Sequence, residues 1–158
     1  MIKVLFLCTG NSCRSIMAEA LLNSNSKGKF KAYSAGSFPV GTIHPLSIKI
    51  LNDNNILTKK FYSKSINEIS HIDMDIIITV CDNAAQETCP ILPTLNIKSQ
   101  WGIEDPAKFK GNLNQIDIEF DRVFKILEKR VIQLTKISFT SIDKNKLSSQ
   151  IDKIGSII

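Results

Sequence analysis

Short apolar runs that alternate with amphipathic segments constrain the fold of this chain more than any other feature of its sequence. Four runs have the length and apolar character of buried strands: 2–7, 30–34, 75–80 and 95–99. Apolar residues recur at helical spacing in three further segments: 15–23, 45–51 and 113–137. This alternation favours parallel βαβ units with right-handed crossovers. We therefore predict an α/β fold of three layers around a central four-stranded parallel sheet.

Length and composition indicate one domain. The chain has 158 residues, 43% of them hydrophobic, which is enough for a proper core. We expect one domain over 1–137 and a C-terminal tail over 138–158 that can hold a short helix. Of the two remaining segments, 56–62 is expected to be extended and 65–70 to form a helical turn.

Charge and hydropathy bound the partners and the compartment. The net charge of +5 comes from scattered lysines without a basic run, so no nucleic-acid partner is expected. No stretch approaches the roughly 20 apolar residues that span a bilayer, and the N-terminus lacks the pattern of a signal peptide. We expect a monomer in the cytoplasm without a membrane partner. Four cysteines in that reducing compartment indicate chemistry rather than structural disulfides.

The segment from Cys8 to Ser15 follows the first predicted strand and leads into the first predicted helix. It places a thiol and a guanidinium, Cys8 and Arg14, on either side of one turn. Backbone N–H groups can converge at such a junction, and the helix N-terminus adds partial positive charge. A tetrahedral oxyanion fits there with Arg14 as a bidentate donor, and the same field favours Cys8 as the reactive thiolate.

A second cysteine, Cys81, also follows directly after a predicted strand. Ligands of open parallel sheets bind outside the carboxyl ends of the strands. The topology therefore brings Cys8 and Cys81 towards the same mouth, although they are distant in sequence.

The loop Cys8-Thr9-Gly10-Asn11-Ser12-Cys13-Arg14-Ser15 resembles the signature Cys-x-Gly-Asn-x-Cys-Arg-Ser of the low-molecular-weight protein tyrosine phosphatase superfamily. The resemblance implies that Cys8 is the nucleophile, that Arg14 holds the oxyanion, that Asn11 braces the loop and that Ser15 donates a hydrogen bond to the thiolate. The implied substrate-binding residues are Thr9, Gly10, Asn11, Ser12, Cys13, Arg14 and Ser15. For Cys13, a plain interpretation as a buried small side chain is favoured.

The segment from Cys81 to Cys89, continued by Pro90-Ile91-Leu92-Pro93, is similar to the redox segment of the arsenate reductases in this superfamily. A phosphatase needs only the first cysteine, whereas two further thiols suit electron transfer. The resemblance implies that arsenate is reduced to arsenite through a Cys8 adduct and a disulfide relay over Cys8, Cys81 and Cys89. The electrons would come from an external thiol reductant, either thioredoxin or glutathione with glutaredoxin, and no bound cofactor is implied.

Asp105-Pro106 matches an Asp-Pro pair on a late loop of the superfamily, whose aspartate protonates the leaving oxygen. Aspartate before proline is also common in turns for backbone reasons alone. Ala107 follows where tyrosine phosphatases often carry an aromatic residue that stacks on the substrate ring. This difference favours a small inorganic oxyanion.

No metal site is predicted. Some related reductases bind potassium through an asparagine, a glutamate, a serine and an acidic residue. Asn11, Glu19 and Ser34 match the first three, but Lys64 replaces the carboxylate, and its ammonium group can take the place of the cation. The four cysteines also lack the paired Cys-x2-Cys spacing of zinc sites.

Two alternative functions remain open. Phosphate and arsenate are nearly isosteric, so the chain can be a phosphatase that hydrolyses phosphotyrosine or another phosphomonoester through a phosphocysteine. It can also be a non-catalytic oxyanion-binding or redox partner protein, in which case Cys8→Ser leaves function largely unchanged.

Overall fold

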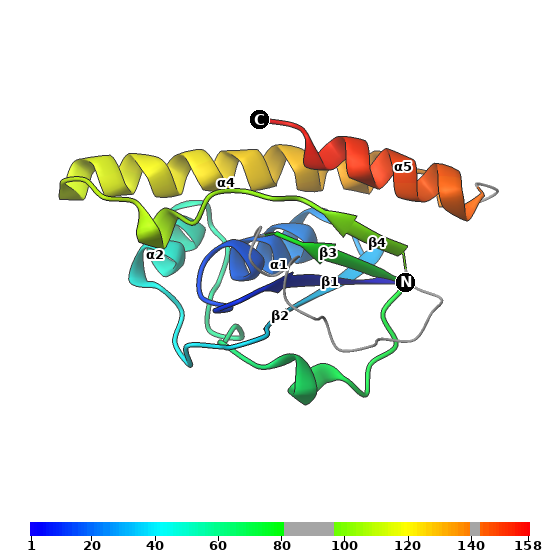
Figure 1. The fold of residues 1–158 in the computed structure, drawn as a ribbon, viewed down its shortest axis with the longest axis horizontal. Helices are drawn as coiled ribbons and strands as arrows, with labels where there is room; N and C mark the ends of the chain where they lie inside the picture. Colours follow the sequence, from blue (N-terminus) through cyan, green and yellow to red (C-terminus); the bar gives the residue numbers. More distant parts are fainter. Residues whose placement is uncertain (81–96, 140–142) are drawn as a thin grey trace.

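The computed structural model describes residues 1–80, 97–139 and 143–158. Its centre is a four-stranded sheet in the order β2-β1-β3-β4. The strands are β1 (Ile2–Cys8), β2 (Phe30–Gly36), β3 (Ile76–Thr79) and β4 (Ile97–Gln100). Every neighbouring pair is parallel, so the carboxyl ends of all four strands lie at one edge (Figure 1). The predicted α/β fold with a four-stranded parallel sheet is confirmed.

Four α-helices accompany the sheet in the described part of the chain: α1 (Arg14–Asn25), α2 (Pro45–Asp53), α4 (Leu113–Lys136) and α5 (Lys144–Gly155). Two short 3-10 helices are η1 (Ile66–Ile69) and η2 (Pro106–Lys108). The expectation of an extended segment over 56–62 is wrong, because these residues form turns and irregular backbone. The turn predicted over 65–70 is η1.

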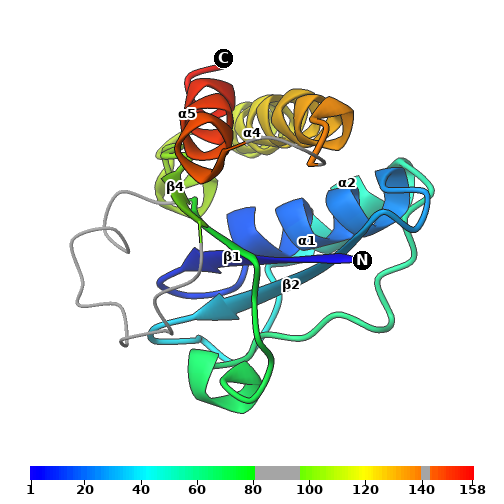
Figure 2. The ribbon, with the colours of Figure 1, turned by 90° about the vertical axis from the view of Figure 1, so that its right-hand side faces the viewer.

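Strand β1 shows why the sheet is covered on both faces. Successive side chains of a strand point to opposite faces. Val4 and Phe6 belong to the large core that includes α1, α2, α4 and α5, whereas Leu5 and Leu7 pack with η1 on the other face. Figure 2 shows the sheet between these layers, with η1 opposite the long helices.

The C-terminal segment, in which a short helix is expected, contains α5. Its buried residues join the large core, and the helix packs against β4 and α4. The buried residues of α5 are Leu147, Ile151 and Ile154. No helix of the described ranges is long and apolar enough to cross a membrane.

Candidate active site

The loop between β1 and α1 is held by its carbonyl groups. The carbonyl oxygens of Cys8, Thr9, Gly10 and Ser12 accept hydrogen bonds from backbone N–H groups of residues 37–44. The carbonyl and the N–H of a trans peptide point in opposite directions, so the N–H groups that follow these carbonyls face away from that segment. The loop therefore turns amide hydrogens towards its interior, at the N-terminus of α1.

Two backbone features let the chain form this loop. Asn11 has a φ of 45°, in the left-handed region that asparagine tolerates better than most residues. Gly36 at the end of β2 lies so close that an added Cβ would be 2.5 Å from the carbonyl oxygen of Thr9. A side chain at position 36 would therefore displace the loop.

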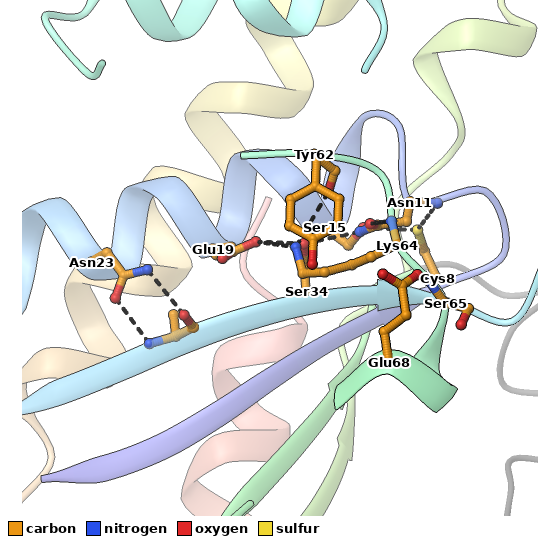
Figure 3. A network of polar contacts seen from close by, with 11 residues as sticks. Cys8, Asn11, Ser15, Glu19, Asn23, Ser34, Tyr62, Lys64, Ser65 and Glu68 are labelled. Carbon is orange, nitrogen blue, oxygen red and sulfur yellow. Dashed lines mark hydrogen bonds and ion pairs between the residues drawn. The ribbon is translucent and has the colours of Figure 1, made fainter. Parts of the chain in front are cut away.

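The Cys8 sulfur lies buried against two donors. The Asn11 backbone N–H donates to Cys8 Sγ at 3.1 Å, and Ser15 Oγ lies 2.9 Å from the same sulfur. Ser15 Oγ accepts a hydrogen bond from Asn11 Nδ2 at 2.9 Å, so its own hydrogen is available to the sulfur (Figure 3). Two donors on one sulfur stabilise a thiolate, the reactive form of cysteine.

Asn11 connects this sulfur to a buried ion pair. Asn11 Nδ2 also donates to Ser34 Oγ at 2.9 Å, and Ser34 Oγ donates to Glu19 Oε2 at 2.5 Å. Lys64 Nζ lies 3.5 Å from the same Glu19 oxygen, and the Lys64 backbone N–H donates to Asn11 Oδ1 at 2.8 Å. Figure 3 shows these residues as one network that joins β2, α1 and the segment before η1.

Burial and the neighbouring charge have opposite effects on the pKa of Glu19. Desolvation raises the pKa of its carboxyl group, while the Lys64 ammonium and the Ser34 hydroxyl act in the opposite direction. A potassium ion beside Glu19 would face the Lys64 ammonium, so these residues do not fit one. The Lys64 ammonium already supplies a positive charge beside the Glu19 carboxylate.

Arg14 and Asp105 are brought together although they are far apart in sequence. Arg14 Nη2 lies 3.1 Å from Asp105 Oδ2, and Arg14 Nη1 donates to the carbonyl oxygen of Ile103 at 2.7 Å. Asp105 Oδ1 accepts from the Ala107 backbone N–H at 3.1 Å, which begins η2. These partners use part of the guanidinium and fix its plane, which leaves further N–H donors for an oxyanion.

Cys13 lies in the same loop but in a different environment. It is buried, and burial raises the pKa of its thiol to about 11. At neutral pH it is therefore a protonated thiol, which is a poor nucleophile. Cys81 and Cys89 lie outside the described residues, and within the described ranges no cluster of histidine, cysteine, aspartate or glutamate has the arrangement of a metal site.

The structure gives contacts around the loop to residues for which the sequence indicated no role, among them His44, which was expected to be exposed and is half-buried. His44 Nδ1 accepts from the Leu46 N–H and so caps α2, its ring stacks on Phe120, and its backbone N–H donates to the Ser12 carbonyl. Ser63 Oγ donates to the Gly10 carbonyl. The His44-Pro45 pair is the only signal in this group, since proline after a capping residue marks a helix start.

The family model for low molecular weight phosphotyrosine protein phosphatase matches residues 3–148. An arsenate reductase of Shouchella clausii is 36% identical over 124 residues, which cover 76% of this chain and 85% of that protein. Arsenate reductase 1 of Staphylococcus epidermidis is 39% identical over 104 residues, or 66% of this chain and 77% of that protein.

Similar solved structures include arsenate reductases as well. The arsenate reductase of Archaeoglobus fulgidus superposes with a TM-score of 0.69 at 32% identity, covering 85% of this chain and 99% of that one. An arsenate reductase in the phosphate-binding state gives a TM-score of 0.69 at 30% identity, covering 87% and 100% of the two chains. The chain therefore belongs to the low molecular weight phosphotyrosine protein phosphatase family, and it is an enzyme whose similar proteins include arsenate reductases.

Proposed function

We propose that this enzyme reduces arsenate to arsenite, with Cys8 as the nucleophile. The observation that carries the proposal is the buried Cys8 sulfur with its two donors in a loop whose Arg14 meets Asp105. A thiolate, an oxyanion-binding guanidinium and an acid within one site are the groups that substitution at a tetrahedral oxyanion requires. The arsenate reductases among the similar proteins support arsenate as the substrate.

The first step is attack of the Cys8 thiolate on arsenic. Residues Thr9 to Ser15 surround the oxyanion, and Arg14 holds two of its oxygens. A Cys8–arsenic bond forms while an arsenic–oxygen bond breaks, and Asp105 supplies the proton with which that oxygen leaves as water. Arsenic remains in the +5 state at this point.

Cys81 and Cys89 carry out the electron transfer that follows. Cys81 attacks the Cys8 sulfur, a disulfide forms, and arsenic leaves with the bonding pair as arsenite in the +3 state. Cys89 then attacks Cys81, which moves the disulfide to Cys81–Cys89 and frees the Cys8 thiolate. An external thiol reductant, either thioredoxin or glutathione with glutaredoxin, supplies the two electrons that reduce this disulfide. A structurally similar protein from Corynebacterium glutamicum is described as thioredoxin-dependent, which makes thioredoxin the first reductant to test.

The decisive experiment measures arsenate-dependent NADPH consumption with the thioredoxin and glutaredoxin systems supplied in turn. We expect consumption with one of them, and we expect Cys81→Ser to abolish arsenite production. Trapping and peptide mapping should recover a Cys8–Cys81 link and, later, a Cys81–Cys89 link. Absence of consumption with both systems contradicts the proposal.

Hydrolysis of phosphomonoesters is the second candidate, favoured by the family to which the chain belongs. Cys81→Ser separates the two activities, because it should leave hydrolysis of an aryl phosphate intact. Cys8→Ser should abolish both, whereas a non-catalytic oxyanion-binding protein would keep its function in that variant. The reaction is assigned to a monomer in the reducing cytoplasm, and gel filtration tests the first part of that assignment.

A further inference from the structure

The segment from Trp101 to Asp105 connects the catalytic side of the molecule to the C-terminal helix. On one side it supplies both partners of Arg14, the Ile103 carbonyl and the Asp105 carboxylate. On its other side it contacts α4 and α5. The family match ends at residue 148, so most of α5 lies beyond it.

Arg130 of α4 joins the end of the chain to this segment. It is 4% exposed, and its Nε donates to the Ile157 carbonyl at 2.9 Å while its Nη1 donates to the Trp101 carbonyl at 2.9 Å. Within the described ranges no carboxylate pairs with it. A buried guanidinium whose charge is met by backbone carbonyls is costly to displace, because each lost carbonyl leaves desolvated N–H groups.

Helix α5 contacts both the start of this segment and the end of β4 before it. The Trp101 indole N–H donates to the Ile151 carbonyl at 2.9 Å, and Ser99 Oγ donates to Asp152 Oδ1 at 2.6 Å. Gly155 lies so close that an added Cβ would be 2.6 Å from the Gln100 carbonyl oxygen and 2.6 Å from Trp101 Cδ1. Trp101 itself is fully buried.

We propose that Arg130 and α5 are positioning elements of the oxyanion site, which act through Trp101–Asp105 to orient the guanidinium of Arg14. Neither touches the oxyanion. Their contribution is to fix the backbone from which Ile103 and Asp105 contact Arg14, and small displacements of such groups have large effects on binding and rate. This inference rests on the oxyanion-binding role of Arg14 in the proposed function.

Gly155→Ala is the sharpest perturbation, because it adds one methyl group at the contact and removes no polar group. Alanine is a better helix former than glycine, so α5 itself is not weakened. Ser149→Ala, at an exposed position of the same helix, is the matched control. Arg130→Lys is the second variant, since it keeps the charge but loses the planar fork that reaches the carbonyls of Trp101, Gly102 and Ile157.

Three measurements separate positioning from general loosening. The emission of Trp101, the only tryptophan of the chain, reports whether α5 is docked. The affinity for inorganic phosphate reports the placement of Arg14. The rate of Cys8 alkylation by iodoacetamide, followed by peptide mapping, reports the sulfur and its donors, the Asn11 N–H and Ser15 Oγ.

We expect Gly155→Ala and Arg130→Lys to weaken phosphate binding about tenfold, because Arg14 is displaced. The rate of Cys8 alkylation should stay constant, because the sulfur and its donors are not displaced. Trp101 emission should move to longer wavelength in Gly155→Ala, and Ser149→Ala should change none of the three measurements. Phosphate affinities equal to that of the control in both variants overturn the inference. So does an equal loss of phosphate affinity and alkylation rate, which indicates a loosened fold.

Phosphate binding also distinguishes this inference from the proposed function. If the unsubstituted protein binds phosphate but forms no arsenite with either reductant, the proposed function fails, and the variants still decide the role of α5. If the unsubstituted protein binds no phosphate, both are wrong.

Discussion

The two sides of the loop between β1 and α1 are built from different kinds of contact. The Cys8 side rests on side chains that bond one another, from Asn11 through Ser34 to Glu19 and Lys64. The Arg14 side rests on a second guanidinium, Arg130, which bonds backbone carbonyls near Trp101. Side-chain networks are altered by single substitutions, whereas backbone contacts depend on how whole elements pack. Cys8 and Arg14, the proposed nucleophile and the proposed oxyanion-binding residue, should therefore respond to different perturbations.

Arg14→Lys should have the largest effect on function. Lysine keeps the charge but cannot bond the Ile103 carbonyl, Asp105 and an oxyanion with a planar fork. We expect arsenate turnover to fall by about 10²–10³, as when one preorganised donor is removed, while iodoacetamide still alkylates Cys8. Arg122→Lys, in an exposed ion pair, is the control and should be silent. Equal losses in turnover and alkylation would contradict the division between the two sides.

Lys64→Met tests the Cys8 side of the loop through the free energy of unfolding. It leaves the buried Glu19 carboxylate without its ammonium partner, and the free energy of unfolding in urea should fall by about 3–5 kcal/mol at pH 7. The double variant Glu19→Gln/Lys64→Met removes the unpaired charge and should recover most of this loss. A double variant that is no more stable than Lys64→Met would show that the pair matters through packing alone.

The same variant has a defined pH dependence. Burial already raises the pKa of Glu19, and the loss of Lys64 removes the largest opposing influence. A carboxyl group with a raised pKa in the folded state stabilises the fold at low pH and loses that contribution as the pH rises through the folded pKa. The unfolding free energy of Lys64→Met should therefore decline from pH 5 to pH 8, more steeply than that of the double variant.

Asn11 is tested by comparing alanine with glycine. Both lose the amide that bonds Ser15 and Ser34, so both should slow Cys8 alkylation at pH 7 by about tenfold, because one of the thiolate's donors loses its orientation. Only glycine accepts the positive φ without strain, so Asn11→Gly should be more stable than Asn11→Ala by about 1 kcal/mol. Normal alkylation in Asn11→Gly would mean that backbone conformation, not the amide, prepares the sulfur.

Cys13 gives the smallest predicted effect, at alkaline pH. Its pKa of about 11 in the folded protein lies above the ordinary value of 9.0, so the unfolded chain loses this proton first and stability falls as the pH rises. The cost is about 1.4 kcal/mol at pH 10. The difference in unfolding free energy between the unsubstituted protein and Cys13→Ala should shift by this amount, in favour of the variant, from pH 8 to pH 10. A constant difference would contradict the raised pKa.

Local pattern was enough to predict most of the fold. Apolar runs and helical spacing within short windows located all four strands and the helices α1, α2 and α4 near their observed bounds. The error over 56–62 has a plain cause: isolated apolar residues such as Ile56 and Phe61 pack individual side chains against the core, while their backbone N–H groups bond nearby carbonyls and not a neighbouring strand. Apolar content does not by itself indicate extended backbone.

The residues of the candidate site that lie in one stretch of sequence could be predicted. Those that the fold brings together from distant positions were harder to predict. The loop from Cys8 to Ser15 carries its chemistry in one segment, and Asp105 was found through the resemblance of its Asp-Pro pair. Arg130 gave no signal, because it sits in an ordinary amphipathic helix and its partners are backbone carbonyls, which every residue has. The roles assigned to Cys81 and Cys89 remain predictions, since both residues lie outside the described ranges.

Among the described elements, α5 follows those that surround Cys8, which has a consequence for folding during translation. The strand–loop–helix unit that carries Cys8 needs partners from the first half of the chain, so it can assemble early in translation. Trp101 and Arg130 acquire their last partners only when Ile151 and Ile157 have emerged. During synthesis the partners of Cys8 are therefore available before those that hold Trp101 and Arg130 in place.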